Sequence, residues 1–141
     1  MIKIVNIGMN HETAPVELRE LAAVGEHTID EVMGTMRTIK DIKESILLST
    51  CNRVEILFTT ENEEGATESV IDFLCHYSQI SRDKLLSLLY IYHDKEAIRH
   101  IFRVGASMDS LIIGEPQILG QVKEAYRVAV NHKSSDRKSV V

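Results

Sequence analysis

The chain has 141 residues, enough for one sizeable hydrophobic core and too few for two domains of ordinary size. Hydrophobic residues make up 44% and charged residues 26% of it, as in folded globular proteins and unlike disordered chains. A formal charge of -5 argues against a broad basic surface that would bind the phosphates of nucleic acid. The composition predicts a single folded domain over residues 1–141.

The distribution of cysteines and apolar residues bears on the compartment. Cys51 and Cys75 form no C-x-x-C pair and cannot staple a chain of this length, so we expect reduced thiols. No stretch approaches the roughly 18 apolar residues of a membrane span, and the first residues have too short an apolar run for a signal peptide. We therefore expect a cytoplasmic protein that makes no contact with a membrane.

The hydrophobic pattern predicts the element order β-α-β-β-α-β. Thr28 and Glu31 have the spacing of a capping box at the start of the first helix. The predicted elements are a strand over 3–9, a loop over 11–16, a helix over 29–40, strands over 45–50 and 54–60, a helix around 70–77 and a strand over 88–92. This order is typical of a ferredoxin-like α/β (α+β) fold, an antiparallel sheet with helices on one face.

Additional helices are predicted on the C-terminal side of this layer. Asp94 suits the N-cap of one, whose inner face would consist of Ala97, Ile98, Ile101 and Phe102. Pro116 suits the first turn of another, with Gln117 and Gln121 together on one side. Its opposite, apolar stripe consists of Ile118, Leu119, Val122, Ala125, Tyr126 and Ala129.

The stretch STCNRVE, residues 49–55, places a thiol and a guanidinium at the bend between two predicted strands. Cys51 could act there as a thiolate nucleophile, or it could pack as a small buried hydrophobe, which is commoner for a free cysteine. Arg53 could bind an acidic substrate and favour the thiolate, or it could be a surface arginine that is solvated or paired with Glu55. The residues alone leave these alternatives open.

The histidines and the second cysteine give weaker signals. His100 lies at the border of a helical stripe, from which an imidazole can face a cleft, although a structural histidine is commoner. Cys75 lies inside a predicted helix, which favours a structural role. Cys75 and His76 lack the remaining ligands of a zinc site, so the sequence supports no metal.

Three longer stretches carry a family resemblance: NIGMNHETAPVELRE (residues 6–20), LLSTCNRVEI (47–56) and GASMDSLIIGEPQILGQVKEAY (105–126). Together with EAIRHIFRV, they resemble the N-terminal catalytic domain of glutamyl-tRNA reductase, in the expected order and over nearly the whole chain. That family reduces glutamyl-tRNA with NADPH to glutamate 1-semialdehyde, the first committed step toward 5-aminolevulinate and tetrapyrroles such as heme.

The resemblance implies roles for the candidate residues. Cys51 would attack the aminoacyl ester, displace the tRNA and hold the glutamyl group as a thioester, which hydride then releases as the aldehyde. Arg53 would bind a substrate carboxylate, and His100 matches a histidine considered important for activity. The implied glutamate pocket consists of Thr50, Cys51, Asn52, Arg53, Ser110, Glu115, Pro116, Gln117 and Gln121. The hydroxyl, amide and guanidinium groups of such a pocket can select glutamate, because a smaller or uncharged substrate could not make the same hydrogen bonds.

The sequence departs from the family pattern in two places. Ser107 and Met108 stand where the family more often has Gly-Leu, and no G-x-G-x-x-G dinucleotide fingerprint occurs before Val141. We therefore expect a fragment. The NADPH-binding domain and the helical domain that forms homodimers would lie outside this chain. The resemblance also admits contact with the downstream aminomutase.

Two other functions fit the same residues. One is a non-catalytic ferredoxin-like binding or regulatory module in which Cys51 merely packs. The other is a stand-alone cysteine acyltransferase or thioesterase. Thiol reactivity at Cys51 would distinguish the binding module from the reductase and from the stand-alone enzyme. Dependence on glutamyl-tRNA would distinguish the reductase from the stand-alone enzyme.

Overall fold

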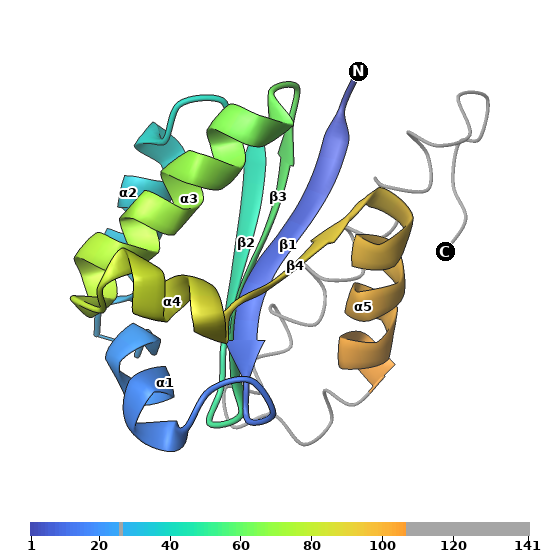
Figure 1. Cartoon of the computed structure of the whole chain (residues 1–141). Coiled ribbons are helices and arrows are strands. Elements are labelled where there is room, and N and C mark those ends of the chain that lie inside the picture. The colour runs from blue at the N-terminus through green and yellow to red at the C-terminus, as the bar shows by residue number, and fades with distance from the viewer. Residues whose placement is uncertain (26, 107–141) are drawn as a thin grey trace.

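The computed structural model describes residues 1–25 and 27–106 (Figure 1). In this part of the chain the elements are, in order, β1 (Lys3–Asn10), α1 (Val16–Ala22), α2 (Ile29–Thr38), β2 (Glu44–Ser49), β3 (Arg53–Thr60), α3 (Glu63–Ser78), α4 (Arg82–Leu88), β4 (Tyr90–His93) and α5 (Asp94–Ala106). The series contains the predicted β-α-β-β-α-β order, followed by α5 as an additional helix.

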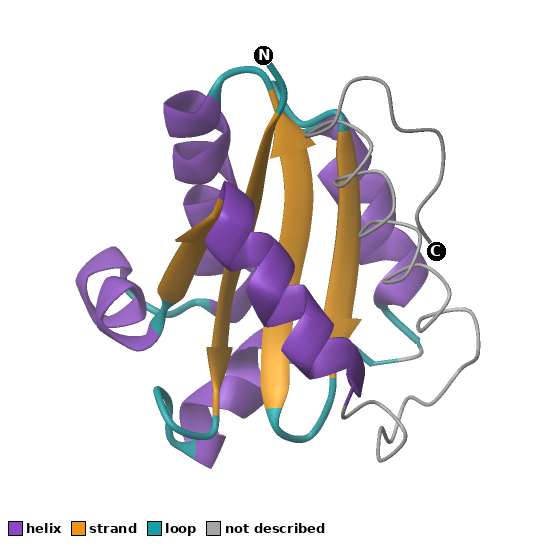
Figure 2. Ribbon diagram, turned by 90° about the vertical axis from the view of Figure 1, so that its right-hand side faces the viewer, coloured by secondary structure: helices purple, strands orange, loops and turns teal. Residues whose placement is uncertain are grey.

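The first strand of the chain lies inside the sheet. The strand order is β2-β3-β1-β4, and neighbouring strands are antiparallel, with Ile7 of β1 opposite Ile56 of β3 and Ile91 of β4. Figure 2 shows α5 crossing in front of the sheet, with the other described helices behind it. An antiparallel sheet built from two interleaved βαβ units is the ferredoxin-like arrangement. The fold class predicted from the sequence is confirmed.

Helix α5 packs on its face of the sheet through one apolar stripe. Ala97, Ile101 and Val104 follow one another at helical spacing and are buried. They form a cluster with apolar residues of the strands, whose buried members are Ile4, Leu48 and Leu57. Among the described residues, this is the smaller of two apolar clusters, and it packs α5 against side chains of the sheet.

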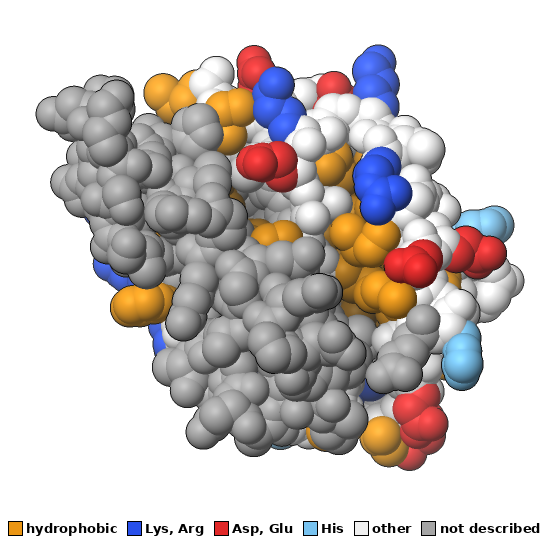
Figure 3. All heavy atoms as spheres, turned by 180° about the vertical axis from the view of Figure 1, so that it is seen from behind, with side chains coloured by type: hydrophobic (Ala, Val, Ile, Leu, Met, Phe, Trp, Pro, Cys, Tyr) orange, Lys and Arg blue, Asp and Glu red, His pale blue; other side chains and the backbone are white. Residues whose placement is uncertain are grey.

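The described surface carries mixed charges. Where described residues are visible in Figure 3, acidic and basic side chains are interspersed. Within residues 1–25 and 27–106, no helix is long and apolar enough to cross a membrane.

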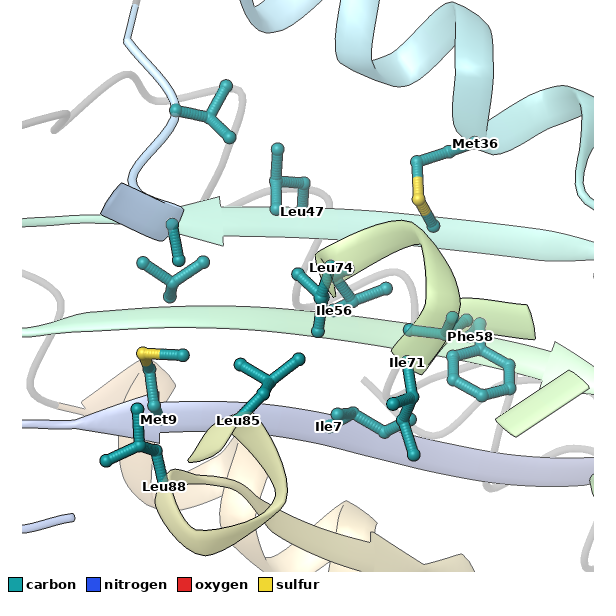
Figure 4. Close-up of a cluster of buried hydrophobic side chains, with 14 of the residues drawn as sticks. Ile7, Met9, Met36, Leu47, Ile56, Phe58, Ile71, Leu74, Leu85 and Leu88 are labelled. Atoms are coloured by element: carbon teal, nitrogen blue, oxygen red, sulfur yellow. The ribbon is translucent and has the colours of Figure 1, made fainter. Parts of the chain in front are cut away.

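Helices α1 to α4 cover the face of the sheet opposite to α5. Successive side chains of a strand alternate between faces, so Ile7 and Met9 of β1 and Ile56 and Phe58 of β3 point toward these helices. Met36 of α2 packs against them from the helix side (Figure 4). This larger cluster is the main hydrophobic core of the described chain.

The structure corrects several local predictions. Helices α1 and α4 have seven residues each, two turns that set up too little periodicity to be predicted. Thr28 does not cap α2 with its side chain, because its hydroxyl group pairs with the backbone of Gly25. Phe102 is 64% exposed and does not lie on the inner face of α5, because the buried stripe runs through His100 instead.

The junction between β4 and α5 also differs from expectation. Helix α4 extends to Leu88, so the strand predicted over 88–92 begins at Tyr90. Asp94 is the first residue of α5, with a φ of 46°, a conformation that aspartate tolerates better than most residues. Its carboxylate accepts a hydrogen bond from the amide of Ile4 at 3.2 Å. Asp94 therefore ties the start of α5 to β1.

A candidate active site at the β2–β3 turn

Strands β2 and β3 are joined by a tight turn with Cys51 and Asn52 at its tip. The amide of Thr50 donates a hydrogen bond to the carbonyl oxygen of Arg53 at 2.8 Å and closes the turn. The Thr50 hydroxyl oxygen accepts hydrogen bonds from the amides of Asn52 and Arg53, at 3.1 and 3.2 Å. A threonine next to a bend commonly acts in this way. Thr50 therefore fixes the backbone that carries Cys51.

Residues around α1 anchor the same turn from outside the hairpin. One terminal nitrogen of Arg19 donates to the carbonyl oxygen of Ala14 at 2.7 Å, and the other donates to that of Cys51 at 3.4 Å. The amide of Val24 donates to the buried Ser49 hydroxyl oxygen at 2.9 Å. Sequence reasoning missed Arg19, because it lies 32 residues from Cys51 and no local pattern marks the contact.

The two thiols of the chain have different surroundings. Cys51 is exposed and free, which contradicts its interpretation as a small buried hydrophobe. Cys75 lies half-buried in α3. Burial raises the pKa of the Cys75 thiol; the charge of Arg82 opposes this rise, and that of Asp72 adds to it. The thiolate is the reactive form, and a raised pKa leaves less of the Cys75 thiol in that form. The exposed Cys51 is therefore the better candidate for a nucleophile.

A buried carboxylate links the turn to α5. Glu55 lies two residues after Arg53 on β3 and is 3% exposed. Its Oε2 atom accepts hydrogen bonds from Nη1 of Arg53 and Nε2 of His100, both at 2.7 Å, and from the hydroxyl group of Tyr90. The donors come from β3, α5 and β4. The structure thus brings Arg53 and His100, two predicted site residues, to one oxygen atom.

Glu55 is ionised in this network. Burial alone would raise the pKa of its carboxyl group. The hydrogen bond and charge of His100, together with hydrogen bonds from Tyr90 and Arg53, outweigh burial and hold that pKa below its usual value. Burial and the Glu55 charge raise the pKa of the Tyr90 phenol, so the hydroxyl group stays a donor.

His100 is oriented by the same carboxylate. A carboxylate oxygen can only accept, so Nε2 of His100 carries a hydrogen and Nδ1 is the nitrogen that can exchange a proton. The rings of Tyr90 and Tyr92 lie beside the imidazole, with centroid distances of 5.2 and 4.7 Å. Sequence reasoning placed His100 at the border of a helical stripe, whereas the structure buries it to 6% exposure.

The alternative interpretation of Arg53 named the right partner but the wrong environment. Arg53 is paired with Glu55, as that interpretation supposed. The pair is largely removed from solvent, however, with side-chain exposures of 19% for Arg53 and 4% for Glu55. Sequence reasoning missed the importance of Glu55, and the only local signal was its position two residues from Arg53 on the same face of a strand.

Of the residues predicted to line the glutamate pocket, only Thr50, Cys51, Asn52 and Arg53 are described. Its five other predicted members lie outside the described residues, namely Ser110, Glu115, Pro116, Gln117 and Gln121, as do Ser107 and Met108. Among the described residues, no group of three His, Cys, Asp or Glu side chains could hold a metal ion. The described sheet is antiparallel, so this part of the chain lacks the parallel-sheet switch point at which a Rossmann-type domain binds a dinucleotide.

Comparison with known proteins identifies the family. A family model described as "Glutamyl-tRNAGlu reductase, N-terminal domain" matches residues 7–139. The chain belongs to this family. Relatives named glutamyl-tRNA reductase are 43% identical over 134 residues in Pelobacter propionicus and 41% identical over 128 residues in Synechococcus sp.. The matches cover 95% and 91% of this chain but only 31% and 29% of those relatives, so the chain spans about a third of their length.

A solved structure agrees with this family membership. Glutamyl-tRNA reductase from Methanopyrus kandleri is similar to the chain, with 29% identity and a TM-score of 0.53. The match covers 91% of this chain and 28% of that structure. The resemblance predicted from the sequence stretches is confirmed at the level of family and fold. The roles of Cys51, Arg53 and His100 stay predictions.

Proposed function

We propose that this chain supplies the acyl-transfer part of a glutamyl-tRNA reductase, in which Cys51 takes the glutamyl group from tRNA. The observation that carries the proposal is the exposed thiol at the tip of a turn held by Thr50 and Arg19. A nucleophile has to be accessible and fixed in place, because orientation contributes much of the rate enhancement of such reactions. Membership of the reductase family supports the choice of substrate.

The reaction at Cys51 exchanges an oxygen ester for a thioester. The thiolate sulfur attacks the carbonyl carbon that joins the glutamyl group to the terminal ribose of tRNA. A carbon–sulfur bond forms, and the carbon–oxygen bond to the ribose breaks. The ribose oxygen takes up a proton and leaves as a hydroxyl group of free tRNA. The glutamyl group then remains on Cys51.

Other residues would recognise the substrate and move protons. The ion pair of Arg53 with Glu55 uses Nη1, and the guanidinium has further donors on Nη2 and Nε for the side-chain carboxylate of the glutamyl group. His100, oriented through Nε2, would exchange a proton at Nδ1. The pocket would be completed by Thr50, Asn52, Ser110, Glu115, Pro116, Gln117 and Gln121.

Reduction of the thioester by NADPH to glutamate 1-semialdehyde, for 5-aminolevulinate synthesis in the cytoplasm, is our proposal for the whole reductase. In that step Cys51 would hold the glutamyl thioester, and we assign the binding of NADPH to a part of the enzyme outside the described residues. A homodimer and a contact with the aminomutase are likewise proposals for the whole enzyme, supported by the family resemblance.

The proposal predicts a covalent adduct on one cysteine. The chain and its Cys51→Ser and Cys75→Ser variants are incubated with glutamyl-tRNA carrying a labelled glutamyl group and then quenched in acid. We expect label on the unaltered chain and on Cys75→Ser, and none on Cys51→Ser, because Cys75 is half-buried in α3. Mass spectrometry locates the adduct. Without a hydride donor, we expect water to release free glutamate slowly.

Other outcomes would select one of the other functions. Equal deacylation of the tRNA by all three proteins, with no adduct, would favour the non-catalytic binding module. An adduct on Cys51 from a small glutamyl ester, combined with none from glutamyl-tRNA, would favour a stand-alone acyltransferase.

A further inference from the structure

Glu55 contacts two predicted site residues but has no part in the acyl transfer described above. We propose that Glu55 is a positioning residue that orients Arg53, and thereby sets the selectivity of Cys51 for acyl groups that carry a carboxylate. This inference rests on the proposed function and deepens it. Neither the family match nor the sequence pattern assigns a role to Glu55.

Three donors fix the carboxylate of Glu55. Arg53, Tyr90 and His100 all donate to the single atom Oε2. Hydrogen bonds to an ionised acceptor are roughly twice as strong as those between neutral groups. The Glu55 side chain is 4% exposed, so water competes little for these bonds. The carboxylate therefore holds the long side chain of Arg53 in one conformation.

The backbone of β1 leaves room for this arrangement. Gly8 lies opposite Glu55 of β3 on one side and opposite Tyr90 of β4 on the other, so the Glu55 side chain has to cross β1 to reach Tyr90. A Cβ atom on Gly8 would lie 2.7 Å from Cγ of Glu55 and 2.7 Å from the carbonyl oxygen of Val54. Any residue with a Cβ atom would clash with the Glu55 side chain here, so this position requires glycine.

The position of Glu55 along β3 explains why it would act on substrate selection. Arg53 is the first residue of β3 and directly follows the turn that carries Cys51. Residues two apart share a strand face, so Glu55 holds Arg53 from within the same strand. A binding group fixed before the substrate arrives loses less conformational entropy on binding. Glu55 should therefore affect which acyl groups react with Cys51, while the reactivity of the Cys51 thiol toward a neutral reagent should not depend on Glu55.

The test compares two small esters on the 141-residue chain. The phenyl esters of the α-carboxyl groups of glutamate and glutamine acylate Cys51 and release phenol, which is followed by absorbance. We expect the unaltered chain to prefer the glutamate ester by at least about 100-fold, since a site built for a charged group rejects its neutral analogue. Glu55→Met removes both acceptor oxygens at similar length. It should reduce the preference to below about 10-fold, as should Arg53→Met.

Matched controls separate selectivity from thiol reactivity and from folding. The rate of Cys51 modification by N-ethylmaleimide, a neutral reagent, should change less than about twofold in Glu55→Met. Glu61→Gln alters an exposed carboxylate that pairs with Lys43 and should keep the full preference. Glu55→Gln keeps one acceptor oxygen without the charge, so we expect an intermediate preference. This variant decides the question if Glu55→Met shows no cooperative thermal transition.

The possible failures are distinguishable. If the unaltered chain prefers the glutamate ester and Glu55→Met keeps that preference, the role of Glu55 is overturned while acyl transfer stands. An unchanged preference in Glu55→Gln has the same meaning where Glu55→Met does not fold. If acylation of the unaltered chain does not occur at Cys51, or shows no preference between the esters, the proposed function fails and the inference fails with it.

Discussion

The two faces of the sheet are stabilised by different interactions. Toward α1–α4, large apolar side chains such as Phe58 and Met36 are fully buried in one continuous cluster. Toward α5 the apolar cluster is smaller, and a cavity of about 20 Å³ lies beside it. Polar side chains are buried on this second face, among them Asn6, Glu55 and His100.

The difference separates what folds the chain from what orients its functional groups. Apolar burial is strong but non-directional, so the α1–α4 face fixes the fold without fixing any one polar group. Hydrogen bonds are directional, so the α5 face fixes the positions of Arg53 and His100. A buried ion pair is often no more stable than a well-packed apolar substitute. Perturbed and paired charges of this kind are, however, common at functional sites.

Shortening Phe58 would break the apolar face most directly. Phe58 is 1% exposed in the larger cluster, whereas its neighbour Leu57 lies on the α5 face beside the small cavity. We expect Phe58→Ala to lower the free energy of unfolding by about 3 to 5 kcal/mol, and Leu57→Ala by about 2 to 3 kcal/mol. Urea denaturation measures both values. A larger loss for Leu57→Ala would reverse the ranking of the two faces.

Acid titration would sharpen the comparison on the α5 face. Because the folded pKa of Glu55 lies below its ordinary value of 4.5, the unfolded chain takes up this proton first as the pH falls. The ionised Glu55 carboxylate therefore stabilises the folded chain fully above pH 4.5, and this contribution is lost as the pH falls through the folded pKa of Glu55. We expect Glu55→Gln to lower the free energy of unfolding at pH 7 by about 1 to 3 kcal/mol.

The check on this prediction is chemical denaturation between pH 7 and 3. The difference between the unaltered chain and Glu55→Gln should narrow below about pH 4.5, the ordinary carboxyl range. A difference that stays constant over the whole range would mean that the charge of Glu55 does not contribute to stability.

The smallest expected effect lies at a helix start away from the Glu55 network. Asn62 caps α3, since its side-chain oxygen accepts a hydrogen bond from the Gly65 amide at 3.2 Å. Its side-chain nitrogen donates to Asp41 at 3.1 Å. Asn62→Ala should cost about 1 kcal/mol in thermal or urea unfolding, and Asn62→Ser less than that. Neither change should alter acylation of Cys51, and a reduced adduct yield would contradict the separation of folding from function.

The fold could largely be predicted because strand alternation and helical periodicity are local signals. They predicted β1, α2, β2, β3, α3 and, with a shifted start, β4, and thereby the ferredoxin-like order. The exceptions have physical causes. The two-turn helices α1 and α4 are too short for periodicity, and Phe102 was expected inside α5 because hydropathy alone ranks it above a histidine. His100 takes the buried place because Glu55 satisfies its hydrogen bond there.

The candidate site could be predicted only in part. Cys51 and Arg53 lie together in the sequence, so the turn could be recognised as a unit. The partners of Glu55 on β4 and α5 lie 35 and 45 residues away from it, and no spacing rule connects them. The contact of Arg19 with the turn is equally non-local. Side-chain networks of this kind follow from the packing of the finished sheet and not from any segment of it.

The central position of β1 has a consequence for synthesis of the protein on the ribosome. Both neighbours of this strand in the sheet, β3 and β4, are translated after it. Contacts at such long sequence separation form slowly, because the entropy of closing the intervening loops has to be overcome first. Until His93 has emerged, β1 exposes an unpaired edge that can pair with other chains. Translation that stops before β4 would therefore leave an aggregation-prone product.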